Sequence, residues 1–245
     1  MPKKTGGGKG KKEKGTQDET TEKVYRQYRK NLQASGLTMP RKLAEKFLSI
    51  RDEKNPGDLN ELNIWEEMGA EGMRCLADAL KEFDYKCLRE IHLWGAKIED
   101  EGLRSLSVYL LQNASVTSLD ITNCAIGPLG CEFLANTFGP GSRNFIIKLK
   151  LDYNDIGDKG MQTLSSGLRS NSVLTDLSLA YCNIGQESAR FLLEIVINQK
   201  CQIKNINLQG NHLRNHGVTV FFRGLTVNGS VESIDLSDNQ FGEHT

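Results

Sequence analysis

The residues of this chain best suited to chemistry are its histidines and cysteines. His212 and His216 lie four residues apart, a spacing that would place both imidazoles on one face of a helix as zinc ligands. No glutamate follows His212 directly, however, and no third ligand is apparent. The six cysteines include no C-x-x-C pair, and the acidic residues form no convergent pair. The sequence therefore predicts no catalytic, cofactor-binding or metal-ligating residues, and both histidines are interpreted as exposed turn residues.

A lysine- and glycine-rich segment opens the chain. Gly6 to Lys11 superficially resembles a phosphate-binding loop, but Thr5 stands where that loop needs glycine and Lys12 where it needs serine or threonine. Residues 1–15 hold six lysines and one glutamate, a composition typical of disorder. We interpret them as a disordered tail that is either simply solvated or an electrostatic tether to an acidic surface.

The chain as a whole is electrically balanced, with 31 basic and 31 acidic residues. This balance gives no electrostatic case for binding nucleic acid or an acidic membrane. No segment approaches the roughly 18–20 apolar residues that span a bilayer, and the basic start lacks the apolar run of a secretory signal. The sequence therefore predicts a cytoplasmic protein whose cysteines stay reduced.

A repeat runs through most of the chain. Its copies start at seven apolar residues that follow one another at intervals of 29, 28, 30, 28, 29 and 28 positions: Leu59, Leu88, Val116, Ile146, Leu174, Ile203 and Val231. Each copy opens with the pattern L-x-x-L-x-L, which places apolar side chains on one face of a short strand. Apolar residues four apart later in the copy, such as Leu106 and Leu110, predict a helix. Because no single unit can bury its own apolar face, the copies must stack.

One position recurs directly after each predicted strand. It is occupied by an asparagine in three copies and by a cysteine in two others: Asn154, Asn211, Asn239, Cys124 and Cys182. A buried side chain at this place can bond to the backbone of a neighbouring copy, so we interpret these five residues as a structural ladder. The pattern I-G-x-x-G that follows, as at Gly157 and Gly160, predicts a turn into the helix.

The repeat resembles the ribonuclease-inhibitor-like class of leucine-rich repeats, whose units of about 28–29 residues contain a full α-helix. The resemblance covers residues 59–245, with about six full repeats and a truncated seventh. It implies a right-handed α/β horseshoe with a parallel sheet on the concave side and helices on the convex side. Residues 16–58 predict two further helices, one capped at Thr16 and one beginning at Pro40, which we interpret as an N-terminal cap over the first repeat.

The seventh copy stops at Thr245, before its helix. A solenoid that ended there would expose the apolar side of the preceding coil. We therefore expect either that the chain continues or that a partner covers this edge.

The informative positions point out of the concave strands. Both tryptophans, Trp65 and Trp94, fall at the same outward position in adjacent copies, although an outward position has no core to accommodate them. Either a partner contacts this pair, since aromatic anchors dominate binding surfaces, or the N-terminal helices cover it. The predicted partner-binding residues of the concave face are Glu61, Trp65, Glu90, His92, Trp94, Asp120, Lys148, Lys150, Tyr153 and Tyr181.

These features predict a non-enzymatic scaffold or adaptor that binds other proteins. The lysine-rich start, followed by helical segments around Val24–Tyr28 and Gly36–Pro40 and then directly by the repeats, is similar to axonemal leucine-rich-repeat proteins. That similarity implies a structural role in a cilium or flagellum, in a radial spoke, the central apparatus or a dynein-regulatory assembly, with the basic tail contacting tubulin or axonemal proteins. The alternatives are a general cytoplasmic adaptor and a regulator of a small GTPase of the Ran-activator type.

Overall fold

The computed structural model describes residues 17–52 and 58–242, in which short strands alternate with helices. The proposed tail, residues 1–15, lies outside the described residues. The strands are β1 (Glu61–Asn63), β2 (Glu90–His92), β3 (Ser118–Asp120), β4 (Lys148–Lys150), β5 (Asp176–Ser178), β6 (Asn205–Asn207) and β7 (Ser233–Asp235). The helices are α1 (Gln17–Ala34), α2 (Arg41–Asp52), α3 (Gly69–Glu82), α4 (Glu99–Gln112), α5 (Pro128–Phe138), α6 (Gly157–Leu168), α7 (Ala189–Val196) and α8 (Arg214–Leu225), with one 3₁₀ turn, η1 (Gln186–Ser188).

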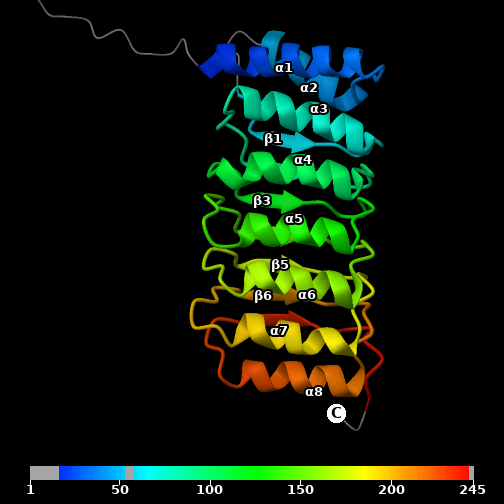
Figure 1. Ribbon diagram of the computed structural model, residues 1–245, viewed down its shortest axis with the longest axis vertical. Helices are drawn as coiled ribbons and strands as arrows, with labels where there is room; N and C mark the ends of the chain where they lie inside the picture. The colour runs from blue at the N-terminus through cyan, green and yellow to red at the C-terminus, as the bar shows by residue number, and fades with distance from the viewer. Residues whose placement is uncertain (1–16, 53–57, 243–245) are drawn as a thin grey trace, which may run out of the picture.

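The seven strands form one parallel sheet in which each strand pairs with the next along the chain, from β1 to β7. Helices α3 to α8 lie on one side of this sheet (Figure 1), and helices that follow one another pack together, as α3 does with α4 and α5 with α6. The row of strands is shorter than the row of helices, so the sheet lies on the inner side of a curve (Figure 1). The α/β horseshoe predicted from the sequence is confirmed.

The core lies between the sheet and the helices. The apolar residues of each opening pattern point into it: in the fourth copy, for example, Leu149 and Leu151 are buried, while Lys148 and Lys150 between and beside them are exposed. This alternation follows from the two-residue period of a strand, which sends neighbouring side chains to opposite faces. From the helix side, Leu106 and the other inward residues complete the core.

The ladder position ties each repeat to the one before it. The amide oxygen of Asn154 accepts the backbone N–H groups of Cys124 and Ile126, both at 3.0 Å, and its amide nitrogen donates to the carbonyl of Ile121 at 2.8 Å. Asn211 bonds in the same way to the backbone of Cys182, Ile184 and Leu179. Burial of these asparagines therefore leaves their polar atoms satisfied.

The two glycines of the I-G-x-x-G pattern have separate roles, which corrects the prediction that both serve the turn. Gly157 adopts φ +60°, a left-handed conformation suited to glycine. Gly127, at the same place one repeat earlier, is extended with φ −110°. The second glycine is needed for packing, because a Cβ atom at Gly160 would come within 3.0 Å of the Cys131 sulfur atom and closer still to the side chain of Ile156.

The helices α1 and α2 precede the first strand. Val24, Tyr28 and Leu32 are buried along one stripe of α1, which packs against α3. The hydroxyl of Thr21 lies 2.9 Å from that of Tyr85, which in turn accepts the backbone N–H of Leu59 at 2.7 Å. The start of α1 is thereby fixed beside the residues that lead into β1. The division of the chain into a cap and a solenoid stays a prediction.

Candidate protein-binding surface

The outward side of the sheet carries the ten residues predicted to bind a partner. They fall into two groups on the strands and two aromatic pairs in the turns after the strands. Glu61, Glu90 and His92 lie together on β1 and β2, and Asp120, Lys148 and Lys150 follow on β3 and β4. The four aromatic residues lie in the turns that follow strands β1, β2, β4 and β5.

The two tryptophans are exposed. Trp65 and Trp94 retain 59% and 61% of their accessible surface, so the alternative that the N-terminal helices cover them is wrong. Helix α2 does reach the first of them: the Lys42 ammonium lies 4.4 Å from the centroid of the Trp65 ring. This is a cation–π contact, in which the negative face of the indole attracts the positive charge.

The two tyrosines form a stacked pair farther along the sheet. The ring centroids of Tyr153 and Tyr181 are 4.8 Å apart and their planes differ by 7°. Both residues have a positive φ, 58° and 55°, which is unusual for an aromatic residue because the Cβ atom crowds the backbone. At the same place in other repeats, Gly95 and Gly210 adopt this conformation. Two exposed aromatic side chains thus occupy a position at which glycine would be less strained.

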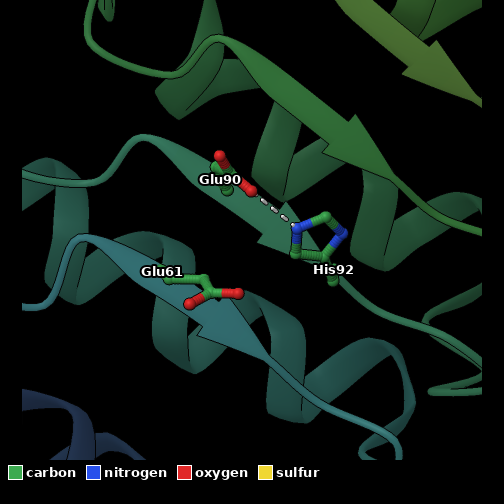
Figure 2. A group of neighbouring side chains, drawn as sticks. All are labelled: Glu61, Glu90 and His92. Carbon is green, nitrogen blue, oxygen red and sulfur yellow. Dashed lines mark hydrogen bonds and ion pairs between the residues drawn. The ribbon is translucent and has the colours of Figure 1, made fainter.

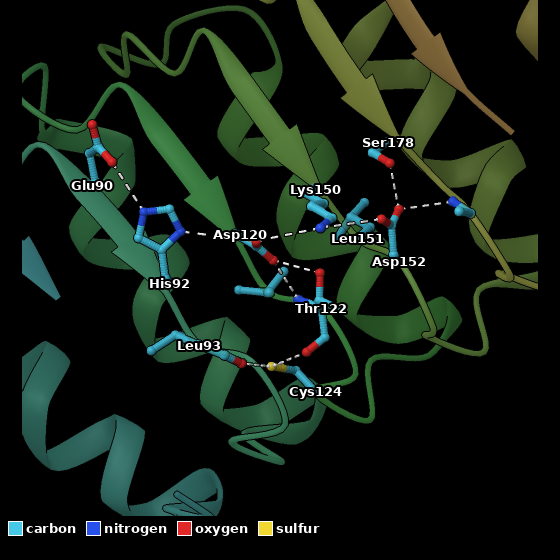
Figure 3. Close-up of polar contacts among 12 residues, drawn as sticks. Glu90, His92, Leu93, Asp120, Thr122, Cys124, Lys150, Leu151, Asp152 and Ser178 are labelled. Atoms are coloured by element: carbon cyan, nitrogen blue, oxygen red, sulfur yellow. Dashed lines mark hydrogen bonds and ion pairs between the residues drawn. The ribbon is translucent and has the colours of Figure 1, made fainter. Parts of the chain in front are cut away.

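A line of polar contacts crosses the sheet from Glu90 to Ser178 (Figure 3). The His92 ring lies between two carboxylates, with Nε2 3.1 Å from Glu90 and Nδ1 4.0 Å from Asp120. The Lys150 ammonium then lies 3.9 Å from Asp120 and 3.7 Å from Asp152. Lys150 therefore lies between the carboxylates of two consecutive repeats.

Two residues expected to face outward are buried. Asp152 is only 5% exposed, because its carboxylate accepts the Ser178 hydroxyl at 2.6 Å and the Ala180 N–H at 2.9 Å from the next repeat. Thr122 is also buried, with its hydroxyl donating to Asp120 at 2.6 Å. Both residues occupy the repeat position at which Trp65 and Trp94 are exposed, so burial at this position differs from one repeat to another.

The structure also corrects the prediction that no acidic residues converge. Glu61 and Glu90 are paired in register on neighbouring strands, and with His92 they form a group whose ligand atoms all lie within 4.8 Å of one another (Figure 2). Two carboxylate oxygens and an imidazole nitrogen are suitable ligands for a divalent cation such as zinc. Sequence reasoning placed all three residues on the concave face without combining them. The signal was available, because the third position is glutamate in two consecutive repeats.

Within the part of the chain that the structure describes, the other histidines and the cysteines do not join such a group. His212 and His216 are both exposed, and Nδ1 of His212 bonds to the Gln240 amide at 2.9 Å. The six cysteines are free thiols. Burial raises the pKa of the Cys124 and Cys182 thiols to about 12, which keeps them protonated and unreactive. Each thiol donates to a carbonyl of the preceding repeat, Cys124 to Leu93 and Cys182 to Leu151.

None of the described helices has the length and apolar character needed to span a membrane.

Comparisons with known proteins agree with the fold. A leucine-rich-repeat family model matches residues 112–135, 144–165 and 170–193. Human NACHT, LRR and PYD domains-containing protein 13 is 30% identical over 170 residues, which are 68% of this chain and 16% of that protein. Pig ribonuclease inhibitor is 26% identical over 189 residues, 76% of this chain and 40% of the inhibitor. Mouse capping protein, Arp2/3 and myosin-I linker protein 2 is 27% identical over 263 aligned residues, 89% of this chain and 20% of that protein. The chain therefore spans no more than 40% of the length of these relatives.

Proposed function

Because the chain belongs to the ribonuclease-inhibitor-like class of leucine-rich-repeat proteins, we propose that it is a non-catalytic scaffold that binds another protein through its concave face. The observation that carries this proposal is the pair of tryptophans, Trp65 and Trp94, exposed at equivalent places in consecutive repeats. An exposed indole costs free energy in water and contributes much of the binding energy when a partner covers it. The stacked pair Tyr153 and Tyr181 extends the same surface toward β5.

Similarity to ribonuclease inhibitor supports a role in binding another protein. The name of that relative describes a protein that acts on another protein, and its repeats align with 76% of this chain. At the β7 end of the sheet, Phe241 is 42% exposed and Ile234 and Leu236 are only partly buried, as expected of an edge that either further chain or a partner covers.

We further propose that this scaffold is a cytoplasmic structural component of a ciliary or flagellar axoneme. The support is the order of segments in the sequence: a lysine-rich start, a helical segment and then the repeats. In such an assembly, the six lysines of residues 1–15 would attract the acidic surface of tubulin or of another axonemal protein.

The experiment is affinity capture with the full chain, comparing the wild-type protein with Trp65→Ala/Trp94→Ala. Capture of tubulin, dynein-regulatory or radial-spoke proteins by the wild-type chain, lost in the double variant, is the expected result. A partner retained equally by both forms would contradict binding through the tryptophans. Capture of Ran, with stimulated GTP hydrolysis, would instead identify a GTPase regulator, and a cytoplasmic partner unrelated to cilia would identify a general adaptor.

A further inference from the structure

Glu61 and Glu90 bring two like charges together on the concave surface. They are register partners on β1 and β2, and like charges directly opposite each other on neighbouring strands repel. Glu90 has His92 as a hydrogen-bond partner at 3.1 Å. No described residue forms a hydrogen bond or an ion pair with the Glu61 carboxylate. A cation supplied from outside the chain would relieve this repulsion.

The described lysines near Glu61 and Glu90 either pair with other carboxylates or form no ion pair with Glu61. Lys97 pairs with Glu67 at 3.0 Å, and Lys150 is held between Asp120 and Asp152. From α2, Lys42 and Lys46 line the hollow beside β1. Neither ammonium forms an ion pair with Glu61 among the residues that the structure describes. Among the described residues, the Glu61 carboxylate therefore lies on the concave face without an ion-pair partner.

The neighbouring tryptophans favour the same kind of ligand. The Lys42 ammonium over the Trp65 ring shows that a cation fits on this surface. Trp94 occupies the same place in the next repeat, and no cation of the described chain lies over its ring. A single hollow is lined by Glu61, Trp65 and residues of α2, so one of the two carboxylates lies beside one of the two indoles.

We propose that the β1–β2 end of the concave face binds a basic segment of a partner protein, with one arginine or lysine between Glu61 and Glu90 and a second over Trp94. This inference rests on the proposed function and specifies the chemistry of its partner. Glu90 opens β2 and Trp94 lies in the turn after it, four residues along the chain, so the two are at most about 13 Å apart at roughly 3.3 Å per residue. An extended partner segment with three residues between its two basic residues is long enough to reach both. A basic side chain fits better than a metal ion, because it uses both the carboxylates and the indole faces.

The test uses the intrinsic fluorescence of the full chain, since Trp65 and Trp94 are its only tryptophans. The probe is a short extended peptide with two arginines separated by three residues, and its control is the same peptide with neutral citrulline at both places. The arginine peptide is expected to change the fluorescence saturably, with affinity that falls as salt rises. The citrulline peptide is expected to have no effect.

Matched variants locate the site. Glu61→Gln/Glu90→Gln is expected to weaken binding of the arginine peptide at least tenfold, while Glu132→Gln on the exposed side of α5 leaves it unchanged. Equal binding by the double variant and the wild-type chain would overturn the proposal. So would binding seen only after removal of residues 1–15, which would assign the surface to the lysines of the chain itself.

A titration with Zn²⁺ distinguishes a metal ion from a basic peptide as the source of positive charge. Saturable binding of Zn²⁺ alone at one ion per chain, lost in His92→Ala, together with no response to the arginine peptide, would overturn the proposal in favour of a cation site. The basic-segment proposal can also fail without contradicting the proposed scaffold function. If Trp65→Ala/Trp94→Ala loses its captured partner while Glu61→Gln/Glu90→Gln keeps it, the scaffold role stands and the basic segment does not.

Discussion

Asn154 and Cys124 occupy the same place in consecutive repeats, and the amide oxygen of Asn154 accepts the backbone N–H of Cys124 at 3.0 Å. Asn211 and Cys182 repeat this relationship at the same distance. In each pair the asparagine binds the preceding turn with both its oxygen and its nitrogen, whereas the cysteine donates its thiol to a carbonyl one repeat farther back. The two residue types together link consecutive turns along the solenoid.

Asn154→Ala is expected to destabilise the protein by about 3 kcal/mol, because it leaves several buried backbone groups without partners at about 1–3 kcal/mol each. Asn154→Cys should cost less, since cysteine serves at this position in two other repeats. Asn136→Ala, at an exposed position on α5, is the control and should be nearly neutral. Urea unfolding measures all three, and a loss below about 1 kcal/mol for Asn154→Ala would contradict the ladder.

Gly167→Ala tests the close packing of α5 on α6. A helix normally gains about 1 kcal/mol from this replacement, but a Cβ atom at Gly167 would overlap the backbone of Ala135. Backbone shifts of this kind cost typically 1–3 kcal/mol or more, so we expect a lower melting temperature. Gly72→Ala in α3 is the matched control, because the nearest atom to its added Cβ, the Met68 Cβ, lies at an ordinary contact distance of 3.5 Å. A stabilised Gly167→Ala protein would show that the two helices are farther apart.

The repeat allowed the strands, the ladder and the aromatic pair to be predicted, because these depend on position within a single unit. Leu149 and Leu151 are buried for the reason the pattern indicates, the two-residue period of a strand. The burial of Asp152 could not be predicted in this way, since it depends on hydrogen bonds to Ser178 and Ala180 in the next unit. The meeting of Glu61 and Glu90, in contrast, was open to prediction, because both occupy the third position of consecutive repeats and the stacked strands pair them in register.

The rate at which each cysteine reacts with a thiol reagent tests how deeply its thiol is buried. Burial raises the pKa of Cys124, Cys131 and Cys182 to about 12, so at pH 8 only about one thiol in 10⁴ would be the reactive thiolate even if reagent could enter. Cys87, which is only partly buried, should react first with an aromatic disulfide reagent. Mass mapping of the modified peptides checks the order. Rapid modification of Cys131 or Cys182 in the native protein would be inconsistent with the structure.

The same shifts predict a loss of stability in alkali. Unfolding returns these thiols to a pKa of about 9.0, so above that pH the unfolded chain releases protons that the folded chain retains. Their contribution is therefore complete below pH 9 and is lost as the pH rises toward about 12. Burial also raises the pKa of Tyr85 and Tyr109, which acts in the same direction. The urea midpoint should fall across this window, and less steeply in Cys182→Ala; a midpoint that stays constant would argue against buried, neutral thiols.

Oxidative footprinting of aromatic side chains, with and without the captured partner, shows whether the concave face is the binding surface. In the free protein, Trp65, Trp94 and Tyr153 should all be oxidised, as should Phe222 on the convex helix α8, since each is about half exposed or more. In the complex, we expect protection of both tryptophans and of Tyr153 with no change at Phe222. Protection of Phe222 while both tryptophans stay fully reactive would instead place the partner on the convex helices.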